Sequence, residues 1–129
     1  MRTTAGVVAA LAVCLVSGHA IAQGVSIDGT WSGGGYAELS GGQREKVRCR
    51  VRYTRETPDV YGVSAVCASP SVKVTQTGTI SRVGANRFIG DLYNPEYDVA
   101  GRVRVVVSGS TQTVTMSSSR GSGSLTLSR

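Results

Sequence analysis

Two cysteines that are equidistant from a proline constrain the fold of this chain more than any other feature. Cys49 and Cys67 lie at equal distances on either side of Pro58, and apolar and polar residues alternate around them. This pattern predicts a β-hairpin that turns at Pro58 and sets the two thiols opposite each other. The same reflection pairs further apolar residues, namely Val51 with Ala65 and Tyr53 with Val63. We therefore predict a Cys49–Cys67 disulfide, which is typical of an exported domain.

The start of the chain has the composition of a secretory signal. Arg2 supplies a basic residue, and an apolar run over residues 6–17 follows that is too short to span a bilayer. Ala20-Ile21-Ala22 then matches the small-residue cleavage pattern. We expect residues 1–22 to be a signal peptide and residues 23–129 to be one domain, periplasmic or secreted in a Gram-negative bacterium. A retained anchor helix is the alternative.

The rest of the chain alternates with a period of two residues and has no helical periodicity. Alternating runs separated by Gly, Ser, Pro and Asn clusters are typical of an antiparallel barrel or sandwich. We expect eight strands, near residues 29–39, 44–56, 60–68, 72–82, 87–93, 98–108, 111–118 and 122–128. Because no helix is available to cover a sheet edge, we predict an all-β, eight-stranded antiparallel up-and-down barrel. A two-sheet sandwich is the alternative.

Turn residues predict the pairing of the later strands. A turn over residues 94–97 would pair Leu92 with Val99. A turn at Arg120-Gly121 would pair Met116 with Leu125.

Several glycines fall on the inward face of this predicted barrel. Gly78, Gly90 and Gly101 would lie side by side on three adjacent strands, and Gly123 would follow in line. Strand interiors normally avoid glycine, so these positions require an explanation. We favour a structural one, in which glycines allow the strands to coil and make room for aromatic side chains. The alternative is a cavity for a small apolar ligand.

A Gly-x-Trp motif, Gly29-Thr30-Trp31, lies on the first predicted strand. In a small exported barrel with a disulfide it resembles the calycin group, which includes lipocalins and avidins. The nearest resemblance is to the Inh-type bacterial inhibitors of secreted metalloproteases. This resemblance implies that Trp31 closes one end of the core and that an inhibitory segment precedes it, over residues 23–28. The alternation places Tyr53 and Phe88 in the interior with Trp31.

Basic residues occupy the outer face of the second predicted strand. Lys46, Arg48, Arg50 and Arg52 alternate with apolar residues, so their side chains project on one face about 7 Å apart. With a net charge of +6, such a row suits an anionic envelope component or an acidic partner. The alternative is a solvated face that keeps the strand soluble. Nucleic acid is not expected, because aromatic residues for base stacking are few.

The residues do not form a constellation that points to catalysis, a cofactor or a metal. The one histidine, His19, lies in the predicted signal segment, and the acidic residues match no metal-binding loop. We therefore expect a monomeric binding protein that is not an enzyme, does not span a membrane, and uses no cofactor or metal. The favoured hypothesis is a protein- or envelope-interaction module, such as a protease inhibitor. The alternative is a carrier of lipocalin type for a small apolar ligand.

Overall fold

The computed structural model describes residues 3–14 and 24–129. The predicted cleavage site after Ala22 lies outside these residues. Residues 3–14 are exposed and form neither helix nor strand. No segment in the described ranges forms a helix that is long and apolar enough to cross a membrane.

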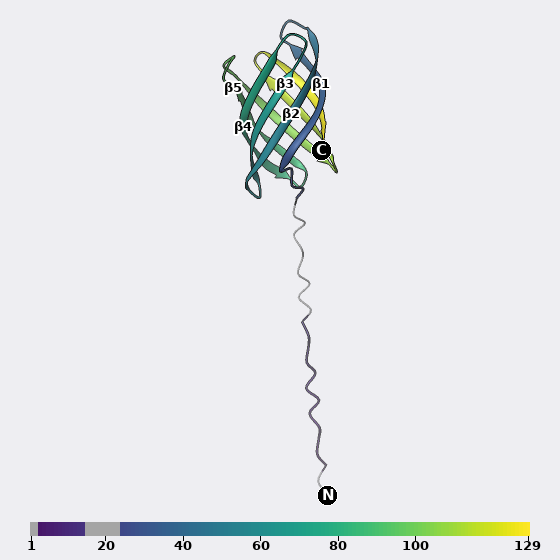
Figure 1. The fold of residues 1–129 in the computed structure, drawn as a ribbon. Helices are drawn as coiled ribbons and strands as arrows, with labels where there is room; N and C mark the ends of the chain where they lie inside the picture. The colour runs from purple at the N-terminus through teal and green to yellow at the C-terminus, as the bar shows by residue number, and fades with distance from the viewer. Residues whose placement is uncertain (1–2, 15–23) are drawn as a thin grey trace.

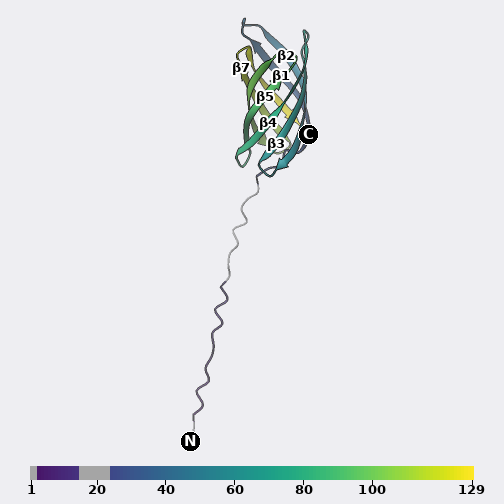
Figure 2. The same cartoon turned by 90° about the vertical axis from the view of Figure 1, so that its left-hand side faces the viewer.

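Eight antiparallel strands form one closed barrel (Figure 1). The strands are β1 (Gly29–Leu39), β2 (Arg44–Thr57), β3 (Val60–Ala68), β4 (Lys73–Gly84), β5 (Arg87–Asn94), β6 (Val99–Ser108), β7 (Thr111–Ser118) and β8 (Gly121–Ser128). Each strand pairs with its sequence neighbours, and β8 pairs back onto β1. The view turned by 90° shows the same tilted wall with turns at its two ends (Figure 2). Closure leaves no open edge, which confirms the up-and-down barrel over the sandwich.

The β2–β3 hairpin has the predicted register. Cys49 lies directly opposite Cys67, their Cα atoms are 4.1 Å apart, and the two residues form a disulfide. The other predicted pairs are also present, Val51 with Ala65 and Tyr53 with Val63. The symmetry about Pro58 therefore predicted the register of this hairpin correctly.

The predicted pairing of β5 with β6 was wrong by two residues. Leu92 pairs with Gly101 and not with Val99. The physical reason is that the turn lies one residue later than predicted, over residues 95–98, and the Asn94 side chain closes it. Asn94 Oδ1 accepts hydrogen bonds from the backbone N–H groups of Glu96 (3.0 Å) and Tyr97 (3.3 Å). The strand pairing consequently continues to Asn94, at the end of β5.

The predicted pairing of β7 with β8 was also wrong by two residues. Met116 pairs with Gly123 and not with Leu125. The turn lies one residue earlier than predicted, because Ser118 Oγ accepts a hydrogen bond from the Arg120 N–H at 3.2 Å. Gly121 begins β8 with a φ of 149°, which side chains disfavour. A shift of two residues keeps every side chain on its predicted face, so the inward set was unaffected. The predicted side-by-side placement of Gly90 and Gly101 was wrong, because they pair with Val103 and Leu92.

Large side chains fill the barrel at the end where the chain enters β1, the lower end in Figure 1. Trp31 and Phe88 are both 0% exposed, and Tyr53 is 2% exposed. Trp31 Nε1 donates a hydrogen bond to the Ile27 carbonyl at 2.9 Å. Tyr61 meets Phe88 edge-to-face, with ring centroids 5.6 Å apart. This packing closes one end of the barrel.

Two arginines hold the segment before β1 against the closed end. The Arg82 guanidinium donates to the carbonyl of Val25 at 2.8 Å, and Arg129 donates to the carbonyl of Ser26 at 2.9 Å. Both guanidinium groups also lie over core rings, Arg82 at 4.7 Å from the Phe88 centroid and Arg129 at 4.4 Å from that of Trp31. Cation–π contacts of this kind add to the hydrogen bonds. The entering segment is therefore part of the barrel end.

Candidate functional site

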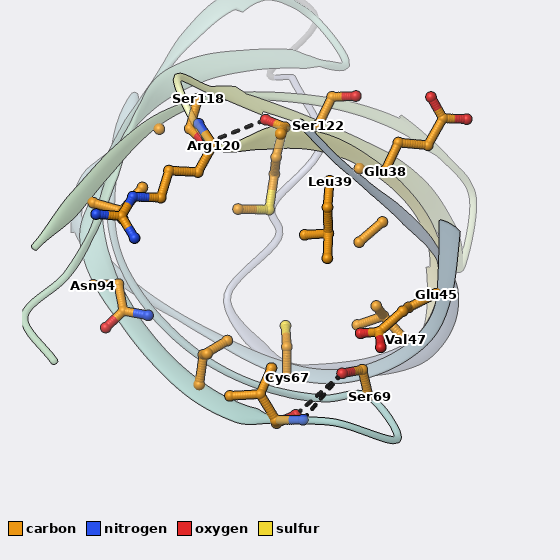
Figure 3. Close-up of a pocket in the computed structure, with 18 of the residues that line it drawn as sticks. Glu38, Leu39, Glu45, Val47, Cys67, Ser69, Asn94, Ser118, Arg120 and Ser122 are labelled. Atoms are coloured by element: carbon orange, nitrogen blue, oxygen red, sulfur yellow. Dashed lines mark hydrogen bonds between the residues drawn. The ribbon is translucent and has the colours of Figure 1, made fainter. Parts of the chain in front are cut away.

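The other end of the barrel is hollow. A cavity of about 550 Å³ opens between the four turns at this end (Figure 3). Its walls are mainly apolar and include the Cys49–Cys67 disulfide. Inward side chains from four strands complete them, notably Val47, Val74, Met116 and Leu125. Sites for small molecules typically measure roughly 300–1,000 Å³, so the cavity is large enough for one. The filled interior that we favoured from the sequence is found at one end only.

The inward glycines divide into two groups that explain this difference. An added Cβ at Gly78 or Gly90 would collide with a backbone carbonyl of the neighbouring strand. These two glycines allow the close approach of the coiled strands. At Gly101 and Gly123 the nearest atom to an added Cβ would lie 3.3 Å away. Both of these glycines line the cavity, where they leave space. Each explanation offered from the sequence therefore applies to different glycines.

Charged side chains surround the mouth of the cavity. Figure 3 shows Arg120 on one side of the opening and Glu45 on the opposite side. Ser71 Oγ lies 2.7 Å and 2.9 Å from the two oxygens of Glu45 and donates to the carboxylate. The hydrogen bond from Ser71, and then one from Ser69, lowers the pKa of Glu45 below its ordinary value. The ionised side chains thus lie at the rim of the cavity, while the walls below remain apolar.

Two amide side chains that we did not single out from the sequence line the cavity. Gln76 has an inward position on β4, and Asn94 ends β5 with 4% of its surface exposed. Because Thr77 pairs with Tyr93, the register places Gln76 and Asn94 at the next facing positions of the two strands. A polar residue at an inward position of an alternating strand was the available signal for Gln76.

The predicted interior residues lie away from the cavity. Trp31, Tyr53 and Phe88 belong to the closed end and do not line the cavity. Tyr53 Oη donates a hydrogen bond to Gln112 Oε1 at 2.6 Å inside this core. Burial raises the pKa of Tyr53 well above its ordinary value, because the charged phenolate would lose its hydration. These residues therefore fill the barrel interior below the cavity.

The predicted basic row, Lys46, Arg48, Arg50 and Arg52, is exposed on the outer face of β2. All the residues paired with it on β1 and β3 are uncharged, namely Thr30, Ser32, Gly34, Tyr36, Ser64, Val66 and Ala68. Within residues 24–129 no ion pair involves the row. The row is therefore separated from the cavity by the barrel wall and presents its charges to solvent.

Comparison with known proteins identifies a fold but no family. No family model and no curated protein matches the chain. A redesigned β-barrel, mFAP1, solved bound to DFHBI, has a TM-score of 0.68 and 15% identity, over 79% of this chain and 94% of that chain. A fluorescence-activating β-barrel of de novo design has a TM-score of 0.61 and 19% identity, over 79% of this chain and 92% of that chain.

These likenesses concern architecture, because the identities are low. They do not support the resemblance to the Inh-type protease inhibitors. The chain is similar in fold to designed barrels, and its own strand topology agrees with that likeness. It is thus a closed, eight-stranded antiparallel β-barrel.

Proposed function

We propose that this chain is an exported, non-catalytic binding protein that holds a small, mainly apolar molecule in the open end of its barrel. The cavity of about 550 Å³ with apolar walls carries this proposal. An apolar molecule that enters it exchanges water for contacts with the wall, at roughly 25 cal/mol per Å² of buried surface. A redesigned barrel of similar fold is solved bound to DFHBI, which is compatible with such a role.

The construction of the barrel supports a pocket rather than a channel. Ile27, Trp31 and Phe88 are 0% exposed at the closed end, so a ligand would enter and leave through the mouth. The disulfide joins β2 to β3 in the cavity wall. A wall that is already ordered lowers the entropy cost of binding.

The proposal can be tested with N-phenyl-1-naphthylamine, a neutral dye whose fluorescence increases in apolar surroundings. We expect the protein to bind it, and we expect Val74→Trp to weaken binding. Val74 lines the cavity, so an indole at this position would occupy part of the space that the dye needs. Loss of contacts worth about 1.4 kcal/mol already weakens binding tenfold. Thr75→Trp is the matched control, because Thr75 is the exposed neighbour of Val74 on β4.

Circular dichroism would confirm that both variants remain folded. The expected result is weak binding by Val74→Trp and unchanged binding by Thr75→Trp. Absence of dye binding by the original protein would contradict the proposal. Equal affinities of the original protein and a folded Val74→Trp variant would contradict it as well.

The basic row favours a second candidate function, the binding of an anionic envelope component. Arg48, Arg50 and Arg52 are exposed, unpaired within the described ranges, and flanked by uncharged residues. Retention on heparin provides the test. Replacing the three arginines with Ser should lower the salt concentration at which the protein elutes. A control that replaces Arg102 and Arg104 with Ser removes charge from the exposed face of β6. If the two variants shift elution equally per charge removed, net charge alone explains retention.

Protease inhibition by the segment before Trp31 has weaker support. The carbonyls of Val25 and Ser26 accept hydrogen bonds from barrel arginines. Ile27 in the same segment is 0% exposed. A segment that is held in this way would have to leave the barrel before it could enter a protease cleft.

A further inference from the structure

An unsatisfied hydrogen-bond acceptor lies in the wall of the cavity. Gln76 Oε1 is buried and has no hydrogen-bond partner among residues 3–14 and 24–129. Gln76 lines both the large cavity and a smaller void of about 20 Å³ beneath it. Its amide is therefore at the inner limit of the cavity, where the wall is otherwise largely apolar. A buried acceptor without a partner is costly, so a ligand that donates to it gains affinity.

Asn94 supplies a donor next to this acceptor. Its Oδ1 is occupied by the backbone N–H groups of Glu96 and Tyr97, which fixes the orientation of the amide. Figure 3 shows the amide nitrogen of Asn94 directed into the cavity. Nδ2 takes part in neither of these two hydrogen bonds, and it faces the space that a ligand would occupy. The side chain thus presents N–H groups to the cavity in a fixed direction.

The two amides line the same cavity from neighbouring strands. The last β4–β5 pair is Thr77 with Tyr93, and Gln76 and Asn94 are the next residues of the two strands. Residues at facing positions of antiparallel strands have Cβ atoms about 4.5–5.5 Å apart. A free acceptor and a free donor are consequently neighbours on the same patch of an otherwise apolar wall. A ligand group that both donates and accepts a hydrogen bond would satisfy both.

We infer that the ligand is a neutral apolar molecule that carries a hydroxyl group, and that this hydroxyl lies against Gln76 and Asn94. A rotation of the Gln76 amide toward the cavity exposes the buried Oε1; the hydroxyl then donates a hydrogen bond to Gln76 Oε1 and accepts one from Asn94 Nδ2. An ionised group is disfavoured here, because the charged side chains of the cavity, Glu38, Glu45 and Arg120, lie at the mouth. This inference rests on the proposed function and specifies its ligand class.

Three naphthalene derivatives provide a direct test. They are 2-naphthol, which donates and accepts; 2-methoxynaphthalene, which only accepts; and naphthalene, which does neither. Their affinities would be measured by displacement of N-phenyl-1-naphthylamine from the full chain. We expect 2-naphthol to bind roughly fivefold to thirtyfold more tightly than 2-methoxynaphthalene, the range for one or two hydrogen bonds to unsatisfied groups.

Substitution of Gln76 tests the assigned contact. Gln76→Met retains the length of the side chain and removes the acceptor. We expect the advantage of 2-naphthol over 2-methoxynaphthalene to disappear in this variant, while naphthalene, which makes no hydrogen bond, still binds to the more apolar wall. Retained naphthalene binding would show that the cavity is intact. Thr75→Met, on the exposed face of the same strand, is the matched control and should keep the advantage.

The outcomes separate this inference from the proposed function. If all three compounds bind the original protein with similar affinity, the hydroxyl assignment is wrong while the apolar pocket stands. The same conclusion follows if Gln76→Met keeps the full advantage of 2-naphthol. If neither the three compounds nor the dye binds, both the inference and the proposed function are refuted.

Discussion

Removal of the Cys49–Cys67 disulfide is expected to lower the free energy of unfolding by about 3 kcal/mol. The two cysteines are separated by 18 positions in the chain. The loop-entropy relation gives about 3 kcal/mol for a closed loop of this length at 25 °C. The effect acts on the unfolded chain, because the disulfide restricts the conformations that this chain can adopt. Because small domains have free energies of unfolding of about 5–15 kcal/mol, this loss is a large fraction of the total.

Urea unfolding would measure the loss. The protein with Cys14→Ser would be compared with the same protein that also carries Cys49→Ala and Cys67→Ala. Fluorescence of Trp31, the chain's one tryptophan and fully buried, reports unfolding. We expect a lower midpoint and a larger dependence on urea, because the unfolded chain without the loop exposes more surface.

A difference below about 1 kcal/mol between two natively folded proteins would refute this reasoning, because the loop-entropy relation gives about three times that value. It would mean that the unfolded hairpin is confined without the bond. An unchanged dependence on urea with the full loss of stability would also argue against an effect on the unfolded chain. In that case the loss would come from the cavity wall, where both cysteines lie.

Two further predictions concern the glycines and the buried phenol. Gly78→Ala should lower the free energy of unfolding by about 1–3 kcal/mol, as overpacking does, because its Cβ collides with the Asp91 carbonyl. Gly101→Ala should cost less, since its nearest neighbour is 3.3 Å away, and equal urea midpoints for the two variants would contradict this. Burial raises the pKa of Tyr53, so its contribution to stability is complete below the ordinary tyrosine pKa of about 10 and is lost as pH rises above it. Urea midpoints measured against pH should fall in that range, and Tyr53→Phe should flatten the fall; an unchanged slope would count against the burial effect.

Local pattern was sufficient for the strands and for which face of each strand is inward. Alternation depends on neighbouring residues only, so a strand such as β2 is recognisable without knowing its partners. The turns were harder, because the hydrogen bonds to the Asn94 and Ser118 side chains decide where pairing stops. Both pairing errors were of two residues, which preserves the face of every side chain. The barrel was therefore predicted correctly from partly incorrect registers.

The candidate site was less predictable, because it depends on side chains from many strands at one level of the barrel. From the sequence, the basic row was placed on the outer face of the barrel and Trp31 on the inner face, as the structure has them. It did not indicate that the aromatic side chains gather at one end, which leaves small residues such as Gly101 and Gly123 around the other. Gln76 and Asn94 were also missed as a pair, since they are distant in sequence and only the pairing of β4 with β5 brings them to the same end of the barrel.

The sequence by itself determined the fold class, the disulfide and the inward set of residues, because each follows from periodicity and from one symmetric hairpin. The tertiary structure decided how the interior is used. Closure of β8 onto β1 brings Trp31 and Phe88 together at one end and leaves a cavity of about 550 Å³ at the other. The volume of such a cavity depends on the sum of side chains around a complete ring of strands. No stretch of sequence taken alone contains that sum.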